Sequence, residues 1–222
     1  MLRATLLWAS TNPLLAQKLP RYRFVQRATR RFMPGEELGD ALTAAERLAK
    51  VGVSATTTLL GENLNSLEEA DGVVRHYQGA LREIGARGLD AEISVKPTQL
   101  GLDFGVDEAR KRLAQLAEST SALVWMDMEG SEYVDATLDI FRSVKQAQGN
   151  VGRCLQSYLH RTADDLEALL PLDPAIRLVK GAYNEPAGVA FPKKSDVDRS
   201  FVTLTQTLLR ARLSGGQGRP VL

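Results

Sequence analysis

An α/β fold, in which a parallel sheet is wound into a (βα)8 barrel of TIM type, is predicted by three observations. After residue 50, short β-branched or apolar runs alternate five times with segments of helical pattern. The units recur at intervals of roughly 25–40 residues, as expected for right-handed strand–helix–strand crossovers. The first strand–helix turn, at residues 59–63, lacks the glycine-rich fingerprint of a doubly wound dinucleotide-binding sheet, so a barrel fits better.

The expected strands are short apolar runs, as is typical of strands buried in a parallel sheet. The first is β-branched, and the fourth contains the single cysteine, Cys154. A glycine-rich turn at residues 215–218 ends the last helix and leads to what we expect to be the start of a sixth strand. The expected strands cover residues 51–60, 92–96, 123–126, 151–159 and 175–180, with the sixth beginning at residues 220–222.

Each of the five strands is followed by an expected helix. The hydroxyl of Thr162 is expected to cap the fourth of these helices, ahead of Asp164 and Asp165, whose charges complement the positive end of the helix dipole. The expected helices cover residues 66–86, 106–117, 133–147, a segment that begins at residue 162, and residues 196–213.

Two regions are expected along the chain. Residues 1–48 are predicted to form an N-terminal helical segment, in which Asn12-Pro13 opens one helix and residues 42–49 form another. Residues 49–222 are predicted to form the catalytic barrel domain. Because a complete barrel needs about 250 residues, we expect an incomplete barrel of about five βα units that is truncated at the C-terminus. A chain that ends inside a strand leaves an unpaired parallel edge, which proteins avoid, and this also favours a truncated barrel.

Composition and charge place the chain among soluble globular proteins. Of its 222 residues, 44% are apolar and 25% are charged, and the formal net charge is +1. This balance lacks the basic footprint of a nucleic-acid-binding protein. The single cysteine excludes an intrachain disulfide, indicates a reducing compartment and offers no metal-site spacing. No apolar run approaches the about 20 residues of a spanning helix, so we expect a cytoplasmic protein that is able to touch a membrane surface.

The most informative segment is Ile-Arg-Leu-Val-Lys-Gly-Ala-Tyr-Asn-Glu-Pro at residues 176–186. In a parallel α/β protein, groups at the carboxyl end of a strand face the crevice where ligands bind. Two cations, Arg177 and Lys180, and a glycine at such an end suggest an anionic ligand that is approached closely by backbone. Taken alone, a buried strand whose basic residues reach the rim is an equally good interpretation.

Polar side chains follow all five expected strands, and in a barrel they converge on the mouth where catalysis takes place. Lys96 precedes a proline and could form a Schiff base or serve as a point charge for a substrate carboxylate. Asp127 is expected to orient a neighbouring cation or a substrate group, and Glu129 to be a charge at a helix start, like Glu132 and Asp135. The strand-end set comprises Thr58, Glu62, Lys96, Asp127, Glu129, Gln156, Arg177, Lys180 and Tyr183.

Several of these segments together resemble the proline dehydrogenase family, the flavin-dependent enzymes of proline catabolism. The resemblance covers residues 31–192 and rests on five motifs in the family's order. Asn184, after Tyr183, makes the chain similar to the monofunctional bacterial type, since bifunctional members usually carry tryptophan there. The motifs are Arg-Phe-Met-Pro-Gly-Glu, Ile-Ser-Val-Lys-Pro-Thr-Gln-Leu-Gly, Trp-Met-Asp-Met-Glu, Cys-Leu-Gln-Ser-Tyr and Arg-Leu-Val-Lys-Gly-Ala-Tyr.

The resemblance implies an FAD site at the carboxyl ends of the strands and a role for each matching residue. Lys96, Asp127, Arg177 and Tyr183 would be catalytic, with Lys96 on the proline carboxylate and Arg177 near flavin N5. Substrate binding would use Lys96, Ala182 and Tyr183. The cofactor would be bound by Asp127, Met128, Cys154, Gln156, Arg177, Val179, Lys180, Gly181 and Ala182, and no metal would be needed.

The implied reaction is the oxidation of L-proline to Δ1-pyrroline-5-carboxylate by FAD, the first step of proline degradation. Electrons would then pass to a membrane quinone, which implies a peripheral contact with the inner face of the membrane. The family continues through three further strands that carry a Thr-His pair and a paired-arginine clamp, and the sequence does not include them. Two alternatives stay open: a lysine Schiff-base aldolase on a TIM barrel, and an inactive barrel fragment without a cofactor.

Overall fold

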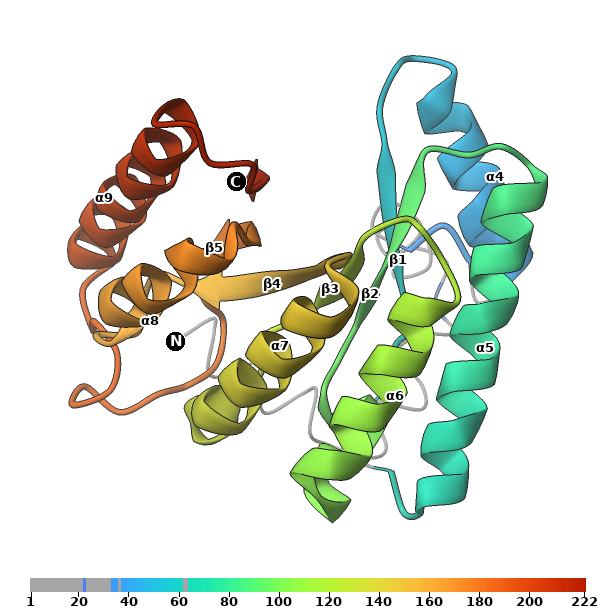
Figure 1. Ribbon diagram of the computed structural model, residues 1–222, viewed down its shortest axis with the longest axis horizontal. Helices are drawn as coiled ribbons and strands as arrows, with labels where there is room; N and C mark the ends of the chain where they lie inside the picture. Colours follow the sequence, from blue (N-terminus) through green and yellow to red (C-terminus); the bar gives the residue numbers. More distant parts are fainter. Residues whose placement is uncertain (1–21, 23–32, 36, 62–63) are drawn as a thin grey trace. The chain divides into compact units, whose positions relative to one another are not determined.

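The chain is represented by a computed structural model that describes residues 22, 33–35, 37–61 and 64–222 (Figure 1). Its contacts divide it into two compact units, Met1–Ser54 and Ala55–Leu222. In the first unit, helix α4 spans Leu38–Ala49 and begins four residues earlier than predicted. A capping box explains the earlier start, because the side chains of Glu37 and Asp40 each accept from the other's backbone N–H. The helix predicted from Asn12-Pro13 lies outside the described residues.

The second unit contains a six-stranded sheet, which confirms the predicted parallel α/β architecture. The strands are hydrogen-bonded in chain order and every neighbouring pair is parallel. The sheet curls as in part of a barrel (Figure 1). Its strands are β1 (Ala55–Thr58), β2 (Ala91–Val95), β3 (Val124–Met126), β4 (Val151–Gln156), β5 (Ala175–Val179) and β6 (Pro220–Val221).

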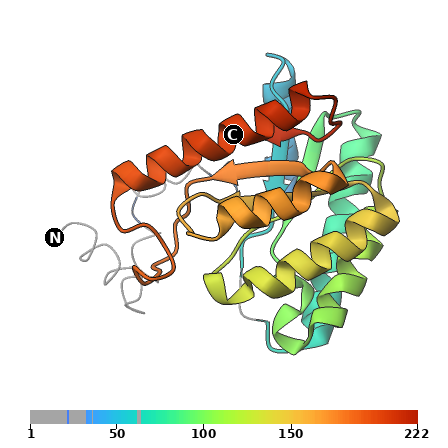
Figure 2. The same cartoon turned by 60° about the vertical axis from the view of Figure 1, so that its left-hand side comes forward.

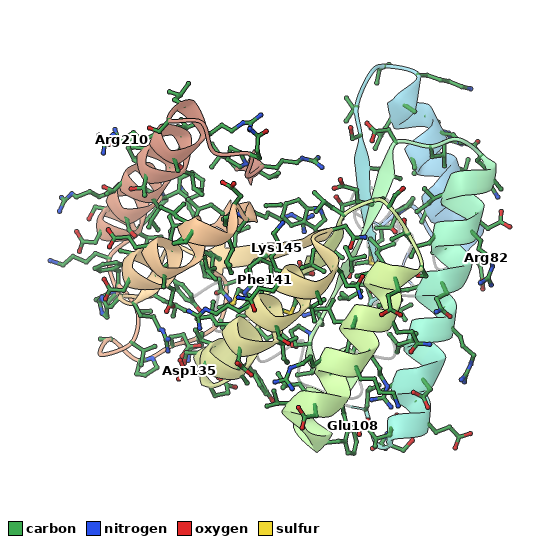
Figure 3. The ribbon with its side chains drawn as sticks, in the orientation of Figure 1. Arg82, Glu108, Asp135, Phe141, Lys145 and Arg210 are labelled. Atoms are coloured by element: carbon green, nitrogen blue, oxygen red, sulfur yellow. The ribbon has the colours of Figure 1, made fainter. Side chains whose placement is uncertain are left out.

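Helices connect the strands and lie along one face of the sheet, as Figures 1 and 2 both show. On α7 (Val134–Gln148), Phe141 is fully buried, whereas Arg82 of α5 (Leu67–Ala86) and Arg210 of α9 (Lys194–Leu213) are exposed at the outer surface (Figure 3). Among the residues that the structure describes, no helix combines the length and the apolar character that a membrane span needs. The helices are α5 (Leu67–Ala86), α6 (Val106–Glu118), α7 (Val134–Gln148), α8 (Thr162–Leu169) and α9 (Lys194–Leu213).

Two sequence predictions about local structure are wrong. Strand β1 covers only four of the ten predicted residues, because residues 51–53 form turns after α4, in which the N–H of Val51 and that of Val53 both donate to the carbonyl of Leu48. The hydroxyl of Thr162 does not cap α8: it donates instead to the backbone carbonyl of Gln156, 2.5 Å away. This bond ties the start of α8 to the end of β4.

Alternate residues of each strand face opposite sides of the sheet. Ile93, Val124 and Ile176 face the helices and are fully buried. The opposite face carries Trp125 and Arg177. Gly152 lies opposite Trp125 in the register of β3 and β4, and a Cβ atom at Gly152 would lie 2.5 Å from the indole ring.

The close approach of Trp125 to Gly152 predicts a stability effect. Gly152→Ala is expected to lower the free energy of unfolding by about 1–3 kcal/mol, because the indole must move in an already packed region. Gly85→Ala is the matched control, since no atom lies within 4 Å of a Cβ at this helical position. The control is expected to raise the same free energy by about 0.5–1 kcal/mol. Urea unfolding of both variants measures the difference, and equal midpoints would contradict the expectation.

Candidate active site

A pocket of about 370 Å³ opens at the carboxyl ends of the central strands. It is lined by the ends of β2, β3, β4 and β5 and by the residues that follow them. All of the residues expected to bind substrate or cofactor line this pocket, except Arg177. Arg177 is hydrogen-bonded to Asp127, which does line the pocket. The lining residues are Lys96, Asp127, Met128, Cys154, Gln156, Val179, Lys180, Gly181, Ala182 and Tyr183.

Arg177 lies beneath the pocket in a polar cluster on the inner face of the sheet. Its Nη1 donates to Ser94 Oγ at 3.0 Å and to Asp127 Oδ1 at 3.3 Å. The guanidinium also lies over the ring of Trp125, 4.4 Å from the ring centroid, and its Nη2 donates to Thr56 Oγ1 at 3.3 Å. Asp127 therefore orients a neighbouring cation, as the sequence predicted, and three further residues of the cluster contact the same cation.

Lys96 and Tyr183 come together from opposite sides of the pocket. The Lys96 Nζ lies 3.5 Å from the Tyr183 hydroxyl, although the two residues are 87 positions apart in the sequence. Lys96 directly follows β2, and Tyr183 lies in the connection between β5 and α9. Two of the three residues predicted to bind substrate thus meet in the pocket.

Gln156, the last residue of β4, is fixed by one end of its amide. Its Nε2 donates to the backbone carbonyl of Glu129 at 2.8 Å. Its Oε1 is buried and has no hydrogen-bond partner in the described part of the chain. A buried acceptor in a pocket wall is costly unless a ligand donor satisfies it, which points to a ligand with an N–H or O–H group.

Glu129 was predicted to be a charge at the start of a helix, and this prediction is wrong. Its side chain is buried and accepts from the backbone N–H and the hydroxyl of Thr98, at 2.9 and 2.6 Å. The segment after β3 therefore bonds to the segment after β2. Sequence reasoning missed Thr98, because a carboxylate close ahead of a helix is normally solvated. Asp135 does lie in the first turn of α7, as predicted.

Lys180 reaches from the end of β5 toward α9. Its Nζ donates to Asp198 Oδ1 at 2.5 Å and lies 5.8 Å from the ring centroid of Phe201. Hydrogen bonds from Lys180 and Lys194 lower the pKa of Asp198. Lys180 thus carries its charge at the rim of the pocket rather than at its base, where Arg177 lies.

Gly181 brings the backbone after β5 against an aromatic ring. Its φ is +105°, and a Cβ atom there would lie 2.3 Å from the ring of Tyr158. Burial is the largest cause that raises the pKa of the Tyr158 hydroxyl, to about 12. The ring is therefore a neutral wall beneath this turn, and the position requires glycine.

Two predicted groups at the end of β1 are not part of the lining set. Thr58 is exposed at the end of the strand, and Glu62 lies outside the described residues. Tyr77 of α5, which the sequence did not single out, connects this end to β2. Its hydroxyl donates to the carbonyl of Ser94 at 2.8 Å and accepts from the N–H of Leu59 at 2.9 Å.

Cys154 lines the pocket as a neutral thiol. Burial is the largest cause that raises its pKa, from 9.0 to about 11. Within the part of the chain that the structure covers, no group of three or more His, Cys, Asp or Glu residues is placed to bind a metal ion. The buried, neutral thiol therefore forms a small part of the pocket wall.

The raised pKa of Cys154 predicts slow alkylation. At pH 8, the native protein is expected to react with iodoacetamide at least about a hundredfold more slowly than the urea-unfolded protein, because the thiolate is the reactive form. Mass spectrometry after timed quenching measures both rates, and the unfolded sample is the control. Native and unfolded rates that agree within a factor of two would contradict this expectation.

A parallel α/β sheet with a polar pocket at the carboxyl ends of its strands is the arrangement of barrel enzymes. The family model described as "Proline dehydrogenase" matches residues 41–215. Proline dehydrogenase 1 of Bacillus subtilis subsp. natto is 36% identical over 219 residues, which cover 97% of this chain and 71% of the relative. The Deinococcus radiodurans proline dehydrogenase is 37% identical over 194 residues, which cover 82% of this chain and 61% of that relative. The chain belongs to the proline dehydrogenase family.

Among solved structures, proline utilization A (PutA) from Bdellovibrio bacteriovorus, inactivated by N-propargylglycine, has a similar fold. The TM-score is 0.73 at 20% identity, and the match covers 84% of this chain and 24% of that chain. This chain therefore spans about a quarter of the length of that PutA chain. The comparisons confirm the expected TIM-barrel-type fold and the monofunctional bacterial type, and they give no support to an aldolase or to a cofactor-free fragment.

Proposed function

We propose that this protein oxidises L-proline to Δ1-pyrroline-5-carboxylate with FAD, and that the pocket at the carboxyl ends of the strands binds both molecules. The observation that carries the proposal is the meeting of Lys96, Asp127, Gln156 and Tyr183 in one pocket. Membership of a family of oxidoreductases that act on proline supports the choice of substrate.

The pocket residues fit a flavin. The buried Gln156 Oε1 lacks a partner among the residues described and is an acceptor for an N–H of the isoalloxazine edge. Met128, Val179 and Ala182 supply apolar wall for a planar ring system. Arg177 places a fixed positive charge beneath the same wall, where it favours a negative charge on the ligand. FAD, when bound, would supply the hydride acceptor.

Lys96 and Tyr183 fit the carboxylate end of an amino acid. The lysine ammonium is a point charge for a carboxylate, and the tyrosine hydroxyl 3.5 Å away restricts where the ammonium lies. Ala182 and Tyr183, which line the same pocket, would flank the pyrrolidine ring. Proline would bind with a neutral amine, so that the ring nitrogen can assist oxidation of the adjacent carbon. Asp127 is a carboxylate in the pocket lining.

The electron acceptor belongs to the same proposal. We infer that electrons leave the reduced protein for a membrane quinone through a transient contact with the cytoplasmic face of the membrane. The absence of a spanning helix from the described residues is compatible with such a peripheral contact. Quinone reductase activity with lipid vesicles that contain a ubiquinone or menaquinone is the direct measurement.

Lys96→Ala tests the substrate role. A charge-assisted contact contributes about 1.5–3 kcal/mol, so KM for L-proline is expected to rise about ten- to hundredfold. Lys111→Ala, which removes an exposed lysine from α6, is the matched control and is expected to leave KM unchanged. Product is quantified by trapping the pyrroline with an aromatic amino aldehyde. An unaltered KM in Lys96→Ala would remove Lys96 from the substrate site.

A further inference from the structure

We infer that Ser94 is a positioning residue whose hydroxyl locks Arg177 and Asp127 together at the base of the pocket. The inference rests on the proposed function, since it concerns how the site holds its charged groups. Ser94 is the fourth of the five residues of β2, is 3% exposed and is not among the residues that line the pocket. Its Oγ nevertheless contacts both charged groups, at 2.6 Å from Asp127 Oδ1 and 3.0 Å from Arg177 Nη1.

The chemistry of the three groups fixes the direction of both hydrogen bonds. A guanidinium only donates, so Arg177 donates to the oxygen of Ser94. The single hydroxyl proton of Ser94 is then free to point at Asp127, whose carboxylate accepts it. The result is a one-way chain from Arg177 through Ser94 to Asp127. The direct contact between Arg177 and Asp127, at 3.3 Å, is longer than either bond through the hydroxyl.

Ser94 is itself rigidly held. Its backbone carbonyl accepts from the buried hydroxyl of Tyr77 at 2.8 Å, and the strand pairs with β1 on one side and β3 on the other. Lys96 follows two positions along the same chain direction, on the same face. Strand β2 and the residue that directly follows it therefore carry both the hydroxyl that orients Arg177 and the proposed carboxylate-binding ammonium.

The other contacts of Arg177 do not replace this hydroxyl. Thr56 and Trp125 each touch the guanidinium, at 3.3 Å and at 4.4 Å from the ring centroid. Among the hydrogen bonds in the described residues, only that of Ser94 links the guanidinium to the carboxylate through a third group. Without the hydroxyl, the carboxylate keeps only the longer direct contact, and both charged groups gain freedom beneath the flavin-binding wall.

Ser94→Ala is the decisive variant, and Ser157→Ala is its matched control. The Ser157 hydroxyl is also fully buried, but it has no hydrogen-bond partner within the described part of the chain. We expect Ser94→Ala to lower kcat about tenfold or more with KM for L-proline within about threefold, and to weaken flavin binding about tenfold. Ser94→Thr, which keeps the hydroxyl on a residue suited to strands, is expected to restore most of the kcat and most of the flavin affinity.

A flavin-independent signal separates positioning from a merely structural role. The chain has two tryptophans, so in a Trp8→Phe background the emission reports Trp125, which lies against the Arg177 guanidinium. Ser94→Ala is expected to change the Trp125 emission of the flavin-free protein, and Ser157→Ala is expected to leave it unchanged. If Ser94→Ala fails to fold, Ser94→Thr takes its place. Wild-type flavin affinity and Trp125 emission in Ser94→Thr would support the inference, and loss of the flavin affinity and the emission would overturn the inference.

The outcomes distinguish this inference from the function on which it rests. A wild-type protein that does not oxidise L-proline would overturn the proposed function and the inference together. A wild-type protein that is active, with a Ser94→Ala variant of equal kcat, flavin affinity and Trp125 emission, would overturn the inference alone. A variant that is less stable but unchanged in these three measurements would make Ser94 structural and would overturn it as well.

Discussion

Gly181→Ala is expected to abolish tight flavin binding and, with it, proline oxidation. The backbone of Gly181 has φ +105°, and an added Cβ would lie 2.3 Å from the Tyr158 ring. An L-residue at this φ costs about 1–3 kcal/mol before any clash is counted. Since the neighbouring Lys180, Ala182 and Tyr183 line the pocket, any displacement of this turn moves the pocket wall.

The size of the effect and its control follow from the same geometry. The strain and the clash together are expected to weaken flavin affinity by more than about a hundredfold. Gly188→Ala is the matched control, because it lies in the same connection between β5 and α9, has no atom within 4 Å of an added Cβ and does not adopt a positive φ. Flavin content and the flavin dissociation constant measure both variants. Wild-type affinity in Gly181→Ala would show that the turn does not shape the flavin site.

Arg177→Met is expected to produce the second large loss. Methionine keeps much of the apolar stem but removes the charge and the hydrogen bonds to Ser94, Asp127 and Thr56. Asp127 then retains only the Ser94 hydroxyl in this cluster. A charged hydrogen bond contributes about 1.5–3 kcal/mol, so flavin binding is expected to weaken more than about tenfold. The reduction potential of the bound flavin is also expected to fall, because a cation favours the anionic reduced form.

An exposed arginine provides the control for this substitution. Arg75 lies on the exposed surface of α5, and Arg75→Met is expected to leave flavin affinity and potential unchanged. Titration of the flavin-free protein gives the affinity, and a redox titration followed in the visible spectrum gives the potential. An Arg177→Met protein with the affinity and potential of the wild type would remove Arg177 from the site.

The alternation of strand and helix could be read from the sequence because parallel strands buried on both faces are continuous apolar runs. The start of β1 could not, since Val51 and Val53 have strand propensity but lie in turns that follow α4. Propensity is a local property, and the backbone hydrogen bonds to Leu48 overrode it. The start of α8 shows the same limit, because Thr162 bonds to Gln156 rather than to its own helix.

The pocket lining was predictable for a topological reason. In parallel sheets every strand ends at the same edge, so residues that follow strands meet there whatever their distance in the sequence. Which side chains pair beneath that edge depends on strand register, which no local pattern encodes. Ser94 illustrates this limit, because its partners Asp127 and Arg177 are 33 and 83 positions away. Its one sequence signal is its place two residues before Lys96, which directly follows the strand.

The visible absorption spectrum of the purified protein, recorded without oxygen before and after the addition of L-proline, tests the central claim most directly. The account predicts a flavin spectrum that bleaches with L-proline as the pyrroline product forms, and that bleaches only at much higher proline concentration in Lys96→Ala. A flavin spectrum that L-proline leaves unchanged, or bleaching that is the same in Lys96→Ala and the wild type, would contradict the assignment of this pocket to proline oxidation.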